Sequence, residues 1–183
     1  MGGVLNNMTY QKPLISPALQ RLSIPKLREL HTKMINLSMS FAMTYEEFKE
    51  IFNESDFNVW DTDSNGVIEG LEVLAGLVLF ADACPDDKVQ FLFNLFDFNR
   101  EDAISRTDLQ LLAYVTLTSV CKILGYSRDI NIQEPSQTVA NYFHSNVKIN
   151  FSALLEFCLH SQQVTQLLTV VNSSINNRSQ SHS

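Results

Sequence analysis

Residues 61–72 of this 183-residue chain read Asp61-Thr-Asp-Ser-Asn-Gly-Val-Ile-Glu-Gly-Leu-Glu72, and this stretch is the most informative part of the sequence. Side chains that carry carboxylate or amide oxygens stand at its positions 1, 3, 5, 9 and 12. Gly66 stands at position 6, where glycine can take the positive φ that a sharp turn requires. Oxygens at this spacing indicate a loop folded around a hard cation, which takes about six to eight oxygen ligands.

The stretch resembles the calcium-binding loop of EF-hand proteins, the calmodulin superfamily, at every informative position. The resemblance implies that Ca2+ is bound by the side chains of Asp61, Asp63 and Asn65, the backbone carbonyl of Val67, Glu69 directly or through water, and both carboxylate oxygens of Glu72. It also implies that Ile68 forms a short β-bridge to a partner loop. The alternative is a solvated acidic turn without a metal.

A second acidic stretch begins at Asp97, 36 residues after Asp61. This is the usual spacing within a pair of EF-hands, so the sequence predicts that the two loops pair through Ile68 and Ile104. The candidate ligands of the second loop are Asp97, Asn99, Glu101, the carbonyl of Ala103, and Asp108.

The second loop departs from the EF-hand pattern. Position 6 is Asp102 instead of glycine, and position 12 is Asp108, one methylene shorter than glutamate. Arg100 and Arg106 reduce its negative charge. We therefore expect this loop to bind Ca2+ much more weakly, to prefer Mg2+, or to serve only as the structural mate of the first loop.

The rest of the chain predicts an all-α protein of paired helix–loop–helix units with degenerate units on either side. The expected divisions are an extended arm over 1–25, an EF-hand pair with a preceding degenerate unit over 26–125, a loop over 126–137, a degenerate unit over 138–171 and a disordered tail over 172–183. The arm contains Pro13, Pro17 and Pro25, and it either dangles or lies along a partner. The segments 43–48 and 149–154 resemble EF-hand loop ends that have lost their metal ligands.

Composition excludes several classes of protein. The net charge of −7 argues against non-specific nucleic-acid binding, and the most apolar stretch is too short to span a membrane. Gly2 could accept a myristoyl group, but Asn6 stands where Ser or Thr is expected, so N-myristoylation is not expected. Three widely spaced cysteines are expected to pack as small apolar side chains in a reducing, cytoplasmic compartment.

No catalytic motif is present, and the four histidines do not stand at catalytic or metal-binding spacing, so an enzyme is not expected. The leading interpretation is a calcium-responsive regulatory subunit that binds one dedicated protein partner. An aromatic groove would suit such a partner, with core packing as the alternative for each of its residues: Phe57, Trp60, Phe80, Phe91, Phe93 and Phe96.

Two other functions remain open. One is a constitutive structural subunit in which calcium regulates little, and the other is a soluble calcium buffer. The pattern of loops is also similar to EF-hand light chains of cilia and flagella, which implies an axonemal location.

Overall fold

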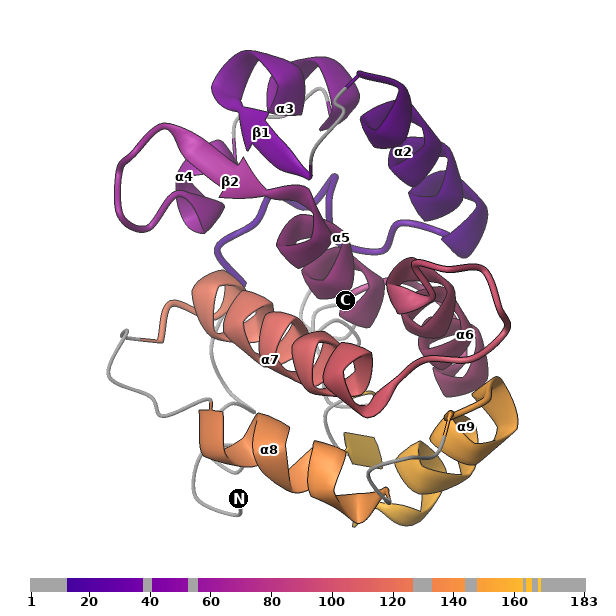
Figure 1. Cartoon of the computed structure of the whole chain (residues 1–183). Coiled ribbons are helices and arrows are strands. Elements are labelled where there is room, and N and C mark those ends of the chain that lie inside the picture. The colour runs from indigo at the N-terminus through magenta and orange to yellow at the C-terminus, as the bar shows by residue number, and fades with distance from the viewer. Residues whose placement is uncertain are drawn as a thin grey trace, which may run out of the picture.

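The computed structural model describes residues 13–37, 41–52, 56–126, 133–143, 148–162, 164–165 and 168. In this part of the chain the fold is all-α with one small sheet, as the sequence predicts (Figure 1). The helices are α2 (Ile24–Leu37), α3 (Tyr45–Phe52), α4 (Phe57–Trp60), α5 (Gly70–Leu79), α6 (Pro85–Phe96), α7 (Arg106–Ile123), α8 (Gln133–Tyr142) and α9 (Phe151–His160), and the strands are β1 (Ala42–Thr44) and β2 (Val67–Glu69).

The helix–loop–helix units pair in an order that differs from the predicted one. β1 pairs with β2 in antiparallel fashion, with Met43 opposite Ile68, and Ile104 forms a separate bridge with Ile149. The predicted pairing of Ile68 with Ile104 is therefore wrong. The bridge needs only backbone groups and an apolar side chain, so a segment that lacks metal ligands can still provide it.

The two pairs occupy different halves of the molecule. In Figure 1, α2, α3, α4 and the two strands lie above α5, whereas α7, α8 and α9 lie below it. Each loop that resembles an EF-hand loop is therefore paired with a degenerate one. The intact loop sits in the upper pair and the weaker loop sits in the lower pair.

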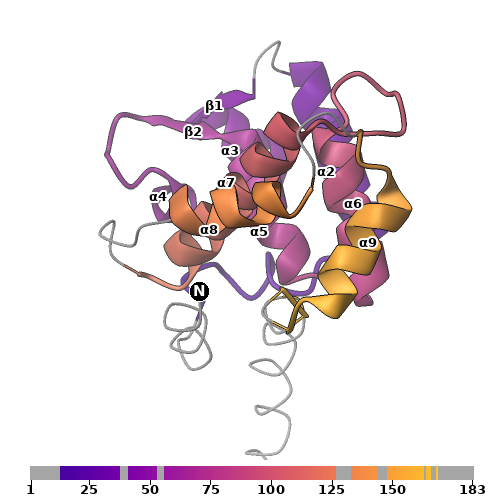
Figure 2. The same ribbon diagram turned by 60° about the horizontal axis from the view of Figure 1, so that its bottom comes forward.

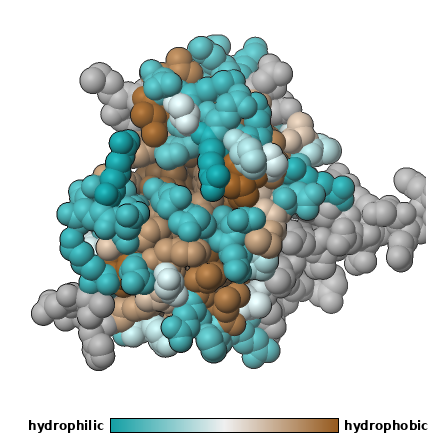
Figure 3. Space-filling view, turned by 90° about the vertical axis from the view of Figure 1, so that its right-hand side faces the viewer, coloured by the Kyte–Doolittle hydropathy of each residue, from teal (hydrophilic) through white to brown (hydrophobic). Residues whose placement is uncertain are grey.

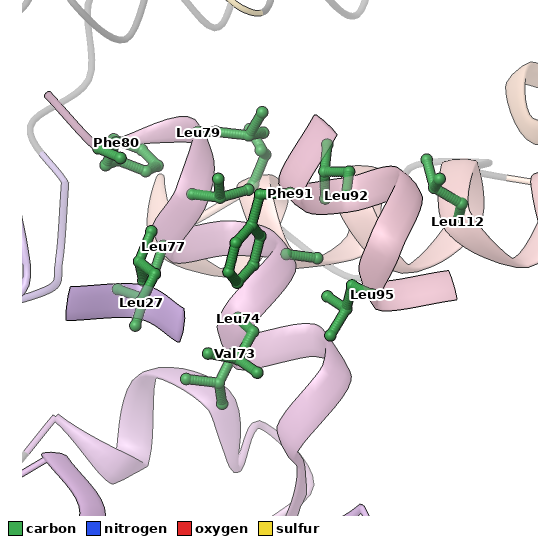
Figure 4. Close-up of a cluster of buried hydrophobic side chains, with 14 of the residues drawn as sticks. Leu27, Val73, Leu74, Leu77, Leu79, Phe80, Phe91, Leu92, Leu95 and Leu112 are labelled. Atoms are coloured by element: carbon green, nitrogen blue, oxygen red, sulfur yellow. The ribbon is translucent and has the colours of Figure 1, made fainter. Parts of the chain in front are cut away.

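Helix α5 lies at the centre of the core. Its sequence is apolar on all sides, and every residue except Leu71 is buried. Figure 4 shows its side chains, such as Leu74 and Leu77, among those of α2, α6 and α7. Gly76 permits the closest approach to α7, because a Cβ there would lie 2.0 Å from the Ser119 hydroxyl oxygen. α7 is thus held tightly against the helix that leaves the intact loop.

The aromatic side chains expected to line a groove lie in the core instead. All six, Phe57, Trp60, Phe80, Phe91, Phe93 and Phe96, are at most 3% exposed. The prediction of an exposed aromatic groove is therefore wrong in this structure, and the alternative of core packing holds. Buried in the core, these side chains do not support the expectation of a single dedicated partner.

The described part of the predicted arm, residues 13–23, packs against the rest of the chain. Ile15 and Leu19 are each 2% exposed. The Leu14 amide donates to the Ile123 carbonyl at 2.7 Å, and the Arg21 amide donates to the Phe80 carbonyl at 3.0 Å. Figure 2 shows this indigo segment running below α5 and α7. The expectation that it dangles or awaits a partner is wrong, because its apolar residues find burial within this chain.

Helix α8 begins at Gln133, so residues 133–137 are helical where a loop was predicted. Pro135 falls in the first turn, where a missing backbone N–H costs a helix nothing. The tail over 172–183 and the Gly2 site lie outside the described residues. In the described part of the chain, no helix is long and apolar enough to cross a membrane.

The cysteines follow their prediction in part. Cys121 and Cys158 are buried, and this burial raises the pKa of their thiols to about 11 and about 12. Cys84 is exposed, contrary to the expectation, and its thiol donates to Asp87 at 3.2 Å.

Candidate metal centre

The intact loop connects α4 to α5 and folds around the carboxylate of Asp61. One oxygen of this carboxylate accepts from the Asn65 amide at 3.0 Å, and the other accepts from the Gly66 amide at 3.1 Å. Gly66 has a φ of +80° and Ser64 a φ of +59°, so the chain reverses at the predicted position. The Asn65 side-chain oxygen accepts from the Val67 amide at 2.8 Å. The backbone therefore has the shape of an EF-hand loop.

Glu72, at position 12, is engaged by a residue from outside the loop. It lies in the first turn of α5 and is only 8% exposed. The Lys122 ammonium, on α7, lies 2.6 Å from one Glu72 carboxylate oxygen and 2.8 Å from the carbonyl oxygen of Trp60. Burial raises the pKa of the Glu72 carboxyl above its ordinary value, and the bond from Lys122 opposes this rise. Lys122 thus provides the positive charge that a buried carboxylate requires.

The loop's residues fit a hard cation by donor chemistry and by backbone shape, but their side chains are not yet gathered. In the described residues, no three Asp, Glu, His or Cys side chains converge on a common point. The predicted ligands that lie in the loop itself, Asp61, Asp63, Asn65, Val67 and Glu69, are half-buried or exposed to water. Glu72 is drawn toward α7, so it would have to leave Lys122 to complete a calcium shell.

The second loop, 97–108, repeats the backbone of the first. Asp97 accepts from the Glu101 amide at 3.1 Å and from the Asp102 amide at 2.9 Å. Asp102 has a φ of +53°, so this residue takes the left-handed conformation that glycine usually takes at position 6. Arg100, at position 4, has a φ of +55°, as Ser64 has in the first loop. The backbone is therefore preserved, although its strain falls on residues with a Cβ.

The side chains of the second loop are committed elsewhere. Asp108 forms a capping box with Ser105, accepting from the Ser105 amide at 2.9 Å while Ser105 accepts from the Asp108 amide at 3.1 Å. Glu101 forms an ion pair with Lys148, which precedes α9. Asp108 and Glu101, two of the five candidate ligands, are therefore already engaged by groups outside a metal shell.

The residue at position 12 differs in its role among the two loops described above and the two degenerate units. In the degenerate first unit, Glu47 accepts from the Thr44 amide at 2.8 Å, so it too closes a capping box. In the last unit Ala153 carries no carboxylate, and its amide donates to Asn150 at 2.9 Å. Glu72 is the one position-12 carboxylate in the described chain that is not used to cap its own helix.

Sequence reasoning missed Lys122 and Lys148 as partners of the two loops. Lys122 stands 50 residues after Glu72, and Lys148 stands 47 residues after Glu101. The only signal for Lys122 is a single charge within the apolar run Val120-Cys-Lys-Ile123. A lysine within an apolar stretch of a helix is expected to pair with an oppositely charged or polar group.

Comparison with known proteins gives several relatives, although no known protein-family model matches the chain. Calcium-binding protein NCSA of Dictyostelium discoideum is 24% identical over 135 residues, which cover 68% of this chain and 70% of that protein. Calcium-binding protein K of the same organism is 34% identical over 88 residues, or 48% of this chain and 45% of that protein. The guanylyl cyclase inhibitory protein of Lithobates pipiens is 22% identical over 158 residues, or 78% of this chain and 77% of that protein. The chain is therefore similar in sequence to calcium-binding proteins, and its paired helix–loop–helix units have the arrangement of the EF-hand fold.

Proposed function

We propose that the loop Asp61–Glu72 is the calcium site of this chain and that the protein is a calcium-responsive regulatory subunit, not an enzyme. The observation that carries the proposal is the state of Glu72. It is the position-12 carboxylate that its own helix does not use as a cap, so it can supply both oxygens to an ion. The second loop serves as a structural mate, because Asp108 and Glu101 are already engaged.

Calcium supplies a divalent charge that draws the loop oxygens to one point when it is bound. In the chain itself, Asp63 and Asn65 offer exposed oxygens, Asp61 offers a half-buried carboxylate, and Glu72 offers a carboxylate at the start of α5. Movement of Glu72 toward the loop would shift α5 relative to α4. Changes of this kind in the angle between flanking helices are how sensor EF-hands alter their binding surfaces.

A protein partner fits the exposed apolar side chains. Figure 3 shows apolar residues between polar ones on the face turned to the viewer. On the described chain as a whole, large apolar side chains exposed by more than 40% include Ile35, Leu37, Tyr114, Tyr142 and Leu159. An axonemal assembly is the more specific form of the proposal, and it rests only on the resemblance to ciliary light chains.

The test of the site is a calorimetric calcium titration of Glu72→Gln beside Glu47→Gln. Both variants replace a position-12 carboxylate, but Glu47 already caps its own helix. We expect Glu72→Gln to weaken calcium binding by about tenfold or more and Glu47→Gln to leave it unchanged. A Glu72→Gln variant within about threefold of the parent would show that this loop is not the main site.

The second candidate is a constitutive structural subunit, and the Lys122–Glu72 pair favours it, because this pair completes the fold without an ion. The fluorescence of Trp60, the chain's single tryptophan, distinguishes the two functions. A change of its emission on addition of calcium, with saturation at the calorimetric stoichiometry, supports the regulatory subunit. An unchanged emission at full calcium occupancy supports the structural one.

A further inference from the structure

Lys122 joins the three helices that meet at the intact loop. It lies in the last turn of α7, and its ammonium contacts the last residue of α4 through the Trp60 carbonyl and the start of α5 through Glu72. The side chains of Lys122 and Glu72 are 21% and 10% exposed, so little water reaches the pair. An ion pair with so little solvent is screened far less than one on the surface.

Ca2+ and the Lys122 ammonium require the same carboxylate. A divalent ion held by Glu72 would replace the ammonium on the oxygen that Lys122 now contacts. We propose that Lys122 is an internal competitor of calcium, so that binding at Asp61–Glu72 exchanges Lys122 for the ion and releases the C-terminal end of α7. The inference rests on the function proposed above and adds the element through which calcium would act.

The C-terminal end of α7 contacts several other parts of the fold, so a loss of the Lys122 contact would reach them. Ile123, the next residue, accepts the hydrogen bond from Leu14 at 2.7 Å, which anchors the segment 13–23. One turn earlier, Ser119 is in close contact with Gly76 of α5. Helix α8 packs along α7, as Figures 1 and 2 show. Loss of the Lys122 contact would therefore affect the lower pair of units, which contains none of the proposed calcium ligands.

The pair at the second loop shows what distinguishes Lys122. Lys148 and Glu101 also join a lysine to a loop carboxylate, but their side chains are 67% and 49% exposed. Water competes for such a pair, so it holds its carboxylate weakly. Of these two pairs, Lys122–Glu72 combines low exposure with a second bond, from Lys122 to the carbonyl of Trp60 in the flanking helix.

The experiment compares calcium binding by the full chain with that of Lys122→Met, Lys122→Gln and Lys33→Met. Lys122→Gln keeps a donor for the Trp60 carbonyl, so it covers the case in which Lys122→Met fails to fold. Lys33 is the matched control, because it pairs with Glu29 on the exposed face of α2 and its loss removes the same charge far from Lys122. We expect both Lys122 variants to bind calcium about tenfold or more tighter than the parent, and Lys33→Met to bind within about threefold of it.

A second readout follows α7 itself. We expect calcium to speed amide hydrogen exchange over residues 118–126 in the parent, whereas Lys122→Gln exchanges fast without calcium and changes little when it is added. Equal calcium affinity in the parent and both Lys122 variants would overturn the competition and leave the proposed site intact. Unchanged exchange over 118–126 in the calcium-bound parent would also overturn it. Absence of calcium binding in the parent and in every variant would overturn the proposed function and this inference together.

Discussion

Replacement of the buried side chains of segment 13–23 by alanine should destabilise the isolated protein strongly. Ile15 and Leu19 are both 2% exposed, and each Ile→Ala or Leu→Ala change in a core costs about 2–5 kcal/mol. The two residues share a core, so the effects of the two substitutions will not add exactly. The double substitution should still lower the free energy of unfolding by at least about 4 kcal/mol. This is a large part of the 5–15 kcal/mol (roughly) that stabilises an ordinary domain.

The assay is urea unfolding of Ile15→Ala/Leu19→Ala, followed through the fluorescence of the buried Trp60. With an m value of about 2 kcal/mol/M, the midpoint should fall by about 2 M. Leu14→Ala is the control in the same segment, because Leu14 is 57% exposed, and it should change stability by less than about 1 kcal/mol. A double variant within about 0.5 kcal/mol of the parent would refute the conclusion that this segment belongs to the core.

Three further predictions concern single features of the fold. Gly76→Ala should lower the free energy of unfolding by about 1–3 kcal/mol in denaturant titrations, and Ser119→Ala, which removes the oxygen 2.0 Å from the new Cβ, should recover part of the loss. Lys88 is buried, which lowers its pKa from 10.5 to about 8, so the folded state binds fewer protons than the unfolded one between these values. The contribution of Lys88 to the free energy of unfolding should therefore rise from about pH 8 to about pH 10.5. Unfolding titrations over this range should show the free energy of unfolding of the parent rising with pH relative to that of Lys88→Met. Asp102→Gly combined with Ser105→Glu and Asp108→Glu should raise the calcium stoichiometry from one to two in calorimetry. The first change relieves the φ of +53°, the second removes the hydroxyl that holds the position-12 carboxylate in a capping box, and the third lengthens the position-12 side chain. A stoichiometry of two in the parent would show that the native second loop is stronger than its engaged side chains indicate.

The local features of the fold could be predicted from the sequence because neighbouring residues determine them. The all-α fold class and the positive φ of Gly66 were predicted correctly. The turn at Gly66 depends on residues within one loop. The capping box of Thr44 and Glu47 is local in the same sense, since its two members are three residues apart.

The errors concern contacts between distant parts of the chain. Ile68 had two apolar partners available, and the sequence pattern favoured Ile104 because that loop still carries metal ligands. In the structure Ile68 pairs with Met43, and this pairing requires only backbone hydrogen bonds and no metal ligands. The prolines of segment 13–23 favoured the prediction of a free arm. The apolar surface that this segment covers is formed by residues distant in the sequence, so it exists only in the folded chain. The bond from Lys122 to Glu72 spans 50 residues and has no local signature at all.

Position 9 explains why only one loop keeps its position-12 carboxylate available. This residue precedes the exit helix and stands where an N-cap is required. It is Thr44, Ser105 or Asn150 in three loops, and these side chains are good caps. Thr44 and Ser105 draw the carboxylate three residues later into a capping box.

In the remaining loop, position 9 is Glu69, which makes no side-chain cap bond in this structure. Glu72 therefore does not cap the start of its helix, and its carboxylate contacts the Lys122 ammonium. Glu69→Ser tests this reasoning, because serine at the N-cap should recruit Glu72 into a capping box. We expect Glu69→Ser to stabilise the N-terminus of α5 and to weaken calcium binding in calorimetry. Glu69→Gln is the control, because it removes the charge without adding a good cap. Equal weakening by Glu69→Ser and Glu69→Gln would show that the charge of Glu69, and not the capping preference at position 9, governs the availability of Glu72.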